Sequence, residues 1–128
     1  MAEMSNYLEN ALINVTLRAT AFTAPTTVYV ALYTTDPTDA DTGTECSGTS
    51  YARQSVTFDA PSNGASTNSA AVEFPQAGSS WGTITHIGIR DALTTGNLLY
   101  HTPLDASKTI ATGDVFRIAT SSLSVTLA

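Results

Sequence analysis

The segment TTVYVALYTT, residues 26–35, is the part of the sequence that decides the fold. Along a strand successive side chains point to opposite faces, so Val30 and Leu32 face one way while Ala31 and Tyr33 face the other. Both faces are apolar, which is typical of a strand that is covered on both sides. We therefore expect one face to pack on the core and the other on a helix or a neighbouring subunit.

Short apolar segments with strand character follow at near-regular spacing through the rest of the chain. They lie at residues 51–58, 71–76, 81–92, 98–104 and 114–128. Turn-rich stretches separate them, among them residues 60–69 and the hairpin signal TTGN at 94–97. Gly88, inside one of these strands, is interpreted as a bulge. Seven or eight such strands predict a mainly β, single-domain antiparallel β-sandwich or jelly-roll-like fold over residues 26–128.

The region before this β segment has the periodicity of one amphipathic helix. Its apolar residues are spaced for a single helical face, and they are Leu8, Ala11, Leu12, Val15 and Ala19. Asn6 and Glu9 have capping-box spacing, and Pro25 makes continuation of the helix unfavourable. The sequence therefore predicts an N-terminal helix over residues 6–20, attached to the sandwich within one domain, residues 1–128.

Composition and charge exclude several classes of function. The chain has 128 residues, a net charge of −6 and only five Lys and Arg residues, which are scattered along its length. Binding to a nucleic acid backbone needs basic residues gathered on one face, so we expect no nucleic acid partner. No apolar run approaches the ~20 residues that span a bilayer, so we expect no membrane insertion. The single cysteine excludes an internal disulfide and a cysteine zinc cluster.

The densest group of charges lies in the loop after the first strand. Its acids are Asp36, Asp39, Asp41 and Glu45. The spacing fails the calcium-loop pattern in the position of its glycine and of its last acid, so we predict a solvated loop and leave a cation at residues 36–45 open. The acids beside Cys46 raise the pKa of its thiol, which predicts an unreactive side chain.

The two histidines, His86 and His101, both lie inside apolar strands. They lack the spacing of a zinc motif, so we interpret them as partly buried, hydrogen-bonded side chains. No nucleophile elbow and no glycine-rich nucleotide loop occurs in the sequence. We predict no catalytic residue, no metal site and no cofactor, and hence a protein that is not an enzyme.

Aromatic and helical apolar residues are the candidates for contact with other subunits, since they bury a large area at small entropic cost. The predicted interface residues are Tyr7, Leu8, Leu12, Tyr29, Tyr33 and Trp81. Trp81 fits a core position equally well, whereas Phe58, Phe74 and Phe116 are predicted to lie in the core.

Several longer segments carry a likeness to a known group of proteins. They include NYLENALIN, TVYVALYTTDPTD, YARQSVTF, SWGTITHIGIRDA and SKTIATGDVFRIA, in this order. Together they resemble small β-rich virion structural proteins of tailed bacteriophages and prophages, described as capsid decoration (cement) proteins or tail fibre proteins. The likeness extends from residue 6 to residue 127, and it implies no catalytic residues.

The resemblance implies a protein of the virion that is synthesised in the cytoplasm of a bacterial host. We favour a capsid decoration protein that binds across major capsid subunits and stabilises the head. The alternative is a tail fibre or tail tip component involved in host attachment. A homo-oligomer is expected, taken as a trimer because closed symmetry suits three-fold sites on a capsid, with the major capsid protein or tail proteins as partners. A carbohydrate- or peptide-binding sandwich outside virions would need an exposed aromatic patch.

Overall fold

A computed structural model describes residues 2–127 and contains one helix and nine strands within that range. In chain order the elements are β1 (Glu3–Met4), α1 (Asn6–Leu17), β2 (Val28–Tyr33), β3 (Gln54–Val56), β4 (Ala65–Thr67), β5 (Val72–Glu73), β6 (Gly82–Arg90), β7 (Leu98–Ile110), β8 (Arg117–Ile118) and β9 (Ser124–Thr126). The predicted domain limits, residues 1 and 128, lie outside the described residues, and the extent of the domain stays a prediction.

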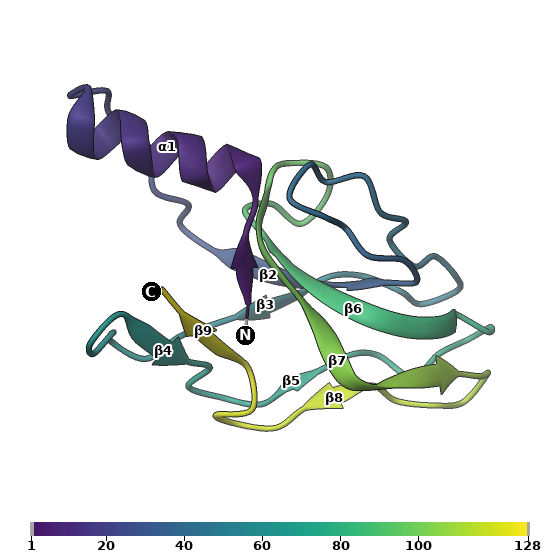
Figure 1. Cartoon of the computed structure of the whole chain (residues 1–128). Coiled ribbons are helices and arrows are strands. Elements are labelled where there is room, and N and C mark those ends of the chain that lie inside the picture. The colour runs from purple at the N-terminus through teal and green to yellow at the C-terminus, as the bar shows by residue number, and fades with distance from the viewer. Residues whose placement is uncertain (1, 128) are drawn as a thin grey trace.

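The strands form two layers that enclose one core. The larger sheet has the order β1-β7-β6-β2-β3, and the pairs β4-β9 and β5-β8 lie across from it (Figure 1). Every pairing is antiparallel. The buried side chains between the layers come from both, among them Leu32, Ile84 and Ile110 of the large sheet and Phe74 and Phe116 opposite. The prediction of a mainly β, antiparallel sandwich with one N-terminal helix is confirmed.

Strand β2 is buried on both faces, as its pattern predicted. Val30, Ala31 and Leu32 are each 0% exposed and Tyr33 is 1% exposed. We expected a helix or a neighbouring subunit over the face that carries Tyr33, but the acidic loop between β2 and β3 lies there instead. Helix α1 contacts mainly β7 and β1, at one edge of the sheet, and projects away from the sandwich (Figure 1).

The hairpin between β6 and β7 confirms the turn signal, with Gly96 in the left-handed region at φ +71°. The bulge expected at Gly88 is wrong, because the register shifts lie on either side of it and Gly88 itself pairs regularly. Because Gly88 has no side chain, Tyr33 and Leu98 can pack directly over it. A Cβ at this position would lie 2.7 Å from the Tyr33 ring and 2.8 Å from Leu98.

Helix α1 begins at Asn6, as predicted, but its capping residue and its C-terminal end differ from the prediction. Ser5 rather than Asn6 is the N-cap, and its hydroxyl accepts the Leu8 N–H at 3.2 Å while donating to the Leu98 carbonyl. The helix ends at Leu17 rather than at residue 20. Ala19 adopts a left-handed conformation at φ +52°, which breaks the helical path and so ends the helix early.

Two short strands lie where the sequence predicted none. β1 pairs with β7 at the sheet edge, and β4 lies inside the stretch 60–69 that reads as a turn. Asn68, fully buried, follows β4 and holds this region together. Its amide donates to the carbonyls of Ala70 and Ala119, and its carbonyl oxygen accepts the N–H of Leu123.

Candidate functional site

The predicted interface residues divide into two groups. Leu8, Tyr33 and Trp81 are 7%, 1% and 2% exposed, so they offer almost no surface to a partner. The Trp81 indole N–H donates to the Thr49 carbonyl at 3.0 Å, which completes its place in the core. Tyr7 is 41% exposed on α1, and Leu12 and Tyr29 are half-buried.

Three buried side chains, two arginines and one histidine, anchor the acidic loop to the rest of the fold. Arg53, Arg90 and His101 are 8%, 7% and 5% exposed, and each is hydrogen-bonded to a different acid of the loop. The acids of the predicted solvated loop remain largely exposed, with the Asp36 and Asp39 side chains at 56% and 46%, but the loop is also anchored by these contacts, which the sequence did not indicate. The acids also do not converge as in a calcium loop, since each of the three points to a different partner.

Arg53 makes the most complete of these contacts. Its Nε and Nη2 atoms donate to the two carboxylate oxygens of Glu45 at 2.9 and 2.7 Å. Its Nη1 atom donates to the carbonyls of Ala92 and Thr95, both at 2.8 Å, in the β6–β7 hairpin. The hydroxyl of Tyr51 adds a third bond to Glu45, at 2.7 Å. One guanidinium thus ties the acidic loop to the neighbouring hairpin.

The pKa of Glu45 reflects this environment. Burial alone raises the pKa of a carboxyl group, but the hydrogen bonds from Arg53 and Tyr51 and the positive charges of Arg53 and Arg90 outweigh it. The pKa of Glu45 is therefore lower than its ordinary value. Burial and the nearby Glu45 raise the pKa of Tyr51, so its hydroxyl stays a donor at neutral pH.

Arg90 repeats the arrangement on the outer face of the sheet. Its Nη1 and Nη2 atoms donate to the carboxylate of Asp41 at 2.8 and 2.9 Å, which is the bidentate geometry that arginine favours. It also donates to the Tyr33 hydroxyl and to the Gly96 carbonyl. Burial alone lowers the pKa of Arg90, but the bonds to Asp41 and Tyr33 raise it overall. The Arg90 guanidinium is therefore charged at neutral pH.

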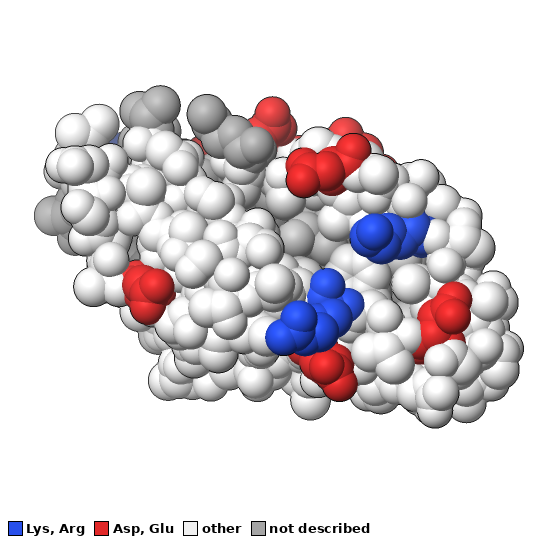
Figure 2. Space-filling view, turned by 90° about the horizontal axis from the view of Figure 1, so that it is seen from below, with Lys and Arg blue, Asp and Glu red and all other residues white. Residues whose placement is uncertain are grey.

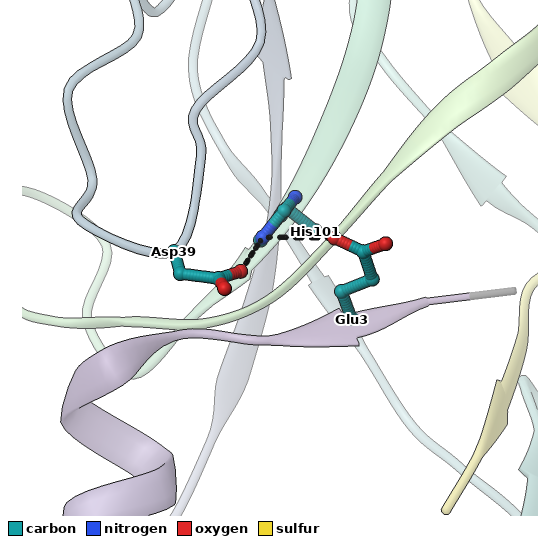
Figure 3. A group of neighbouring side chains, drawn as sticks. All are labelled: Glu3, Asp39 and His101. Atoms are coloured by element: carbon teal, nitrogen blue, oxygen red, sulfur yellow. Dashed lines mark hydrogen bonds and ion pairs between the residues drawn. The ribbon is translucent and has the colours of Figure 1, made fainter.

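His101 lies at the centre of the third contact, shown in Figure 3. Its Nε2 atom is 2.8 Å from Asp39 of the loop and 3.9 Å from Glu3 of β1. Glu3 and His101 are direct partners in the register of β1 and β7. The other ring nitrogen, Nδ1, is 3.8 Å from Asp36. Among residues 2–127, Glu3, Asp39 and His101 are the one group of three or more whose ligand atoms lie close enough to hold a metal ion.

The remaining chemically reactive candidates are occupied or buried. The Nδ1 atom of His86 is hydrogen-bonded to Thr85 at 2.9 Å, and its Nε2 atom is 3.9 Å from Asp36. Burial, with a contribution from Glu45, raises the pKa of the Cys46 thiol to about 12. The thiol is therefore protonated at neutral pH and a poor nucleophile.

A groove of about 620 Å³ opens between β7 and the segment that carries β8 and β9. Buried apolar side chains such as Ile87 and Phe116 line it together with Lys108 and Arg117. Phe116 is the one aromatic residue of this lining and is 4% exposed. The groove therefore does not offer the exposed aromatic platform that a carbohydrate site would need.

Surface charge and helix length bear on two further kinds of partner, nucleic acids and membranes. Figure 2, a view from below, shows basic groups scattered singly among acidic and uncharged ones, without the continuous basic patch that a nucleic acid needs. No helical segment among the described residues has the length and apolar character that crossing a bilayer requires.

Comparison with protein families shows what the chain is related to. The model of the family Podophage GP4 fiber I protein gp80 matches residues 3–126, nearly the whole described chain. The chain belongs to this family. A comparison with curated proteins found no match. Membership of the fiber I family makes the chain a structural protein of the phage virion, in agreement with the resemblance found in the sequence.

Two anchors of the acidic loop, Arg53 and Arg90, were not predicted from the sequence, whereas the prediction that His101 is buried and hydrogen-bonded is confirmed. A signal was present, because a chain with only five Lys and Arg residues places Arg53 and Arg90 inside strand-like segments. A basic residue within an apolar strand is rarely buried unless an acid pairs with it. That rule could have suggested a buried ion pair, although not which acid supplies it.

Proposed function

We propose that this chain is an oligomeric subunit of a bacteriophage fibre and that copies associate through α1 and the segment after it. The exposure of apolar side chains on α1 carries the proposal. The matched family is named as a fibre protein. This name supports a place in a fibre rather than the role in capsid decoration that we favoured from the sequence.

Helix α1 is poorly covered by its own chain. Ile13, Val15 and Leu17 are 53%, 41% and 79% exposed, and Leu8 is the one residue of the helix that is buried. A 12-residue helix is marginally stable in water without tertiary packing. A partner that covered these side chains would bury apolar area and stabilise the helix at the same time.

A second copy of the chain suits this surface on grounds of charge. The chain carries a net charge of −6, so contact between most of its faces brings like charges together. Helix α1 has Glu9 as its single charged residue, so two copies of the helix meet with little repulsion. Closed rotational symmetry, such as that of a trimer, would place α1 beside its own copies.

The size of a stable interface requires more than the helix. A specific interface buries roughly 800 Å² per partner, whereas α1 is only about 18 Å long. The segment after the helix extends the surface, since Phe22 lies beside Tyr7 with ring centroids 6.5 Å apart. A hollow of about 250 Å³ between this segment and the helix, lined by both rings, offers a seat for a side chain of the neighbouring copy.

Sedimentation velocity on the purified chain tests this association. We expect an oligomer of the 13.3 kDa chain, and we expect Leu17→Asp or Ile13→Asp to weaken its self-association at least tenfold (about 1.4 kcal/mol). Leu93→Asp is the matched control, because Leu93 is 51% exposed and belongs to the β6–β7 hairpin rather than to α1. A wild-type chain that stays monomeric at about 100 μM, or equal behaviour of the Leu17 and Leu93 variants, would contradict the proposal.

Capsid decoration is the second candidate, favoured by the acidic charge and by the absence of a fibrous repeat in the sequence. Gold-labelled antibody against the chain, applied to intact virions, separates the two locations. Label confined to fibres supports the fibre subunit, and dense label over the head supports decoration.

A further inference from the structure

We propose that Glu3, Asp39 and His101 form a binding site for a divalent transition metal ion of the zinc type. One ligand atom from each residue lies within 4.8 Å of the other two. The three come from different elements, namely β1, the acidic loop and β7 (Figure 3). The site is independent of the proposed fibre role and of the surface on α1.

The donor set selects the class of ion. One imidazole nitrogen and two carboxylate oxygens are ligands that Zn²⁺ accepts, with a fourth position left for water. Calcium and magnesium prefer oxygen ligands alone, so a site that contains an imidazole discriminates against them. The thiol of Cys46 lies in the core and is not one of the group.

The two distances to the imidazole require only small movements of the carboxylates. Zinc bonds of about 2.0–2.2 Å in a tetrahedron place neighbouring ligand atoms about 3.4 Å apart. The Nε2 atom of His101 is 2.8 Å from Asp39 and 3.9 Å from Glu3, so each carboxylate needs to shift by about 0.5 Å, in opposite senses. The carboxylates can move, because the Asp39 and Glu3 side chains are 46% and 70% exposed.

The imidazole, in contrast, is held in place before any ion binds. The His101 side chain is 5% exposed and lies near the start of β7. Its Nδ1 atom faces Asp36 at 3.8 Å, which resembles the carboxylate commonly found behind a metal-bound histidine. The Asp39 carboxylate can only accept a hydrogen bond, so Nε2 carries a proton in the metal-free chain. An ion that binds Nε2 displaces this proton and leaves the imidazole protonated on Nδ1, the atom on the side of Asp36.

An ion at this position would link three segments of the chain. Strand β1 has two residues and lies at the sheet edge, and Asp39 lies on a loop. A metal ion shared by Glu3, Asp39 and His101 would fasten both segments to β7. Because the unfolded chain does not bring these residues together, binding would also stabilise the fold.

Isothermal titration of untagged protein with ZnCl₂ tests the proposal. We expect one ion per chain, a thermal midpoint that rises with zinc, and at least tenfold weaker binding in Glu3→Gln and Asp39→Asn. Glu3 is 70% exposed, so its variant should fold normally. Glu73→Gln and His86→Gln are the matched controls and should bind zinc as the wild type does, since neither residue belongs to the group.

Three results would overturn the site. They are no zinc binding at about 1 mM, zinc binding that survives both Glu3→Gln and Asp39→Asn, and equal loss in the two control variants. Titration with CaCl₂ adds a check on the donor chemistry. Calcium binding as tight as that of zinc would mean that the imidazole is not a ligand.

Discussion

Neutralising Glu45 tests whether the acidic loop is anchored by its ion pairs. Glu45→Gln keeps the size of the side chain but removes the charge that faces Arg53, whose side chain is 7% exposed. Leaving a buried charge without its partner costs about 3–5 kcal/mol. Arg53 retains its two carbonyl acceptors, and the Glu45 side chain is 26% exposed, so we expect a smaller loss of about 2–3 kcal/mol in the free energy of unfolding.

Urea unfolding at pH 7 measures this loss. Trp81 is the single tryptophan and is 2% exposed, so its fluorescence reports the transition. With a slope of about 2 kcal/mol per M, within the usual range of about 1–3, the midpoint should fall by about 1–1.5 M. The matched control is Glu73→Gln, which removes a carboxylate 3.7 Å from Arg117 on the surface. Both partners of that pair are more than half exposed, so this loss should not exceed about 0.5 kcal/mol.

The pH dependence provides a second readout with a defined sign. The pKa of Glu45 is lowered in the folded state from its ordinary value of 4.5, so the carboxylate stabilises the fold above that pH. The stabilisation is lost as the pH falls through the lower, folded-state pKa. Glu45→Gln cannot titrate, so its difference from the wild type should shrink under acidic conditions. If Glu45→Gln destabilises no more than Glu73→Gln at pH 7, the loop is not held by this pair.

Three further outcomes follow from packing and burial. Gly88→Ala places a Cβ 2.7 Å from the Tyr33 ring, and we expect a loss of about 2–3 kcal/mol in urea unfolding. Asn68→Ala removes three hydrogen bonds from a fully buried side chain and should cost about 3 kcal/mol or more by the same measurement. The pKa of about 12 at Cys46 predicts a thiol that does not react with a disulfide reagent at pH 8 and reacts promptly in 6 M urea; fast reaction in the native state would contradict this burial.

Local patterns were enough to predict the class of fold. Alternating apolar residues in 26–35 and in the later segments indicate strands because the side-chain period of a strand is two residues. The helix followed from its own period in the same way. The ends of elements were less predictable, since Ser5 and Asn6 can both cap a helix. Ser5 is the N-cap, and its hydroxyl also donates to the carbonyl of Leu98, which lies 93 residues away in the sequence. This tertiary contact favours Ser5 over Asn6 as the cap.

The acidic loop shows what depended on tertiary structure. Its residues are visible in the sequence, and their turn chemistry and charge are set locally. The partners of these acids are not visible in the sequence, because they are distant in the chain. Asp41 is bonded to Arg90, 49 residues away, and Asp39 to His101, 62 residues away. Such pairs exist only once β6 and β7 have aligned beneath the loop, and strand order and register are not encoded in any local period. Composition and periodicity therefore determined the sandwich and the excess of negative charge, whereas the packing of distant strands decided which acids became anchors and which of them meet a histidine.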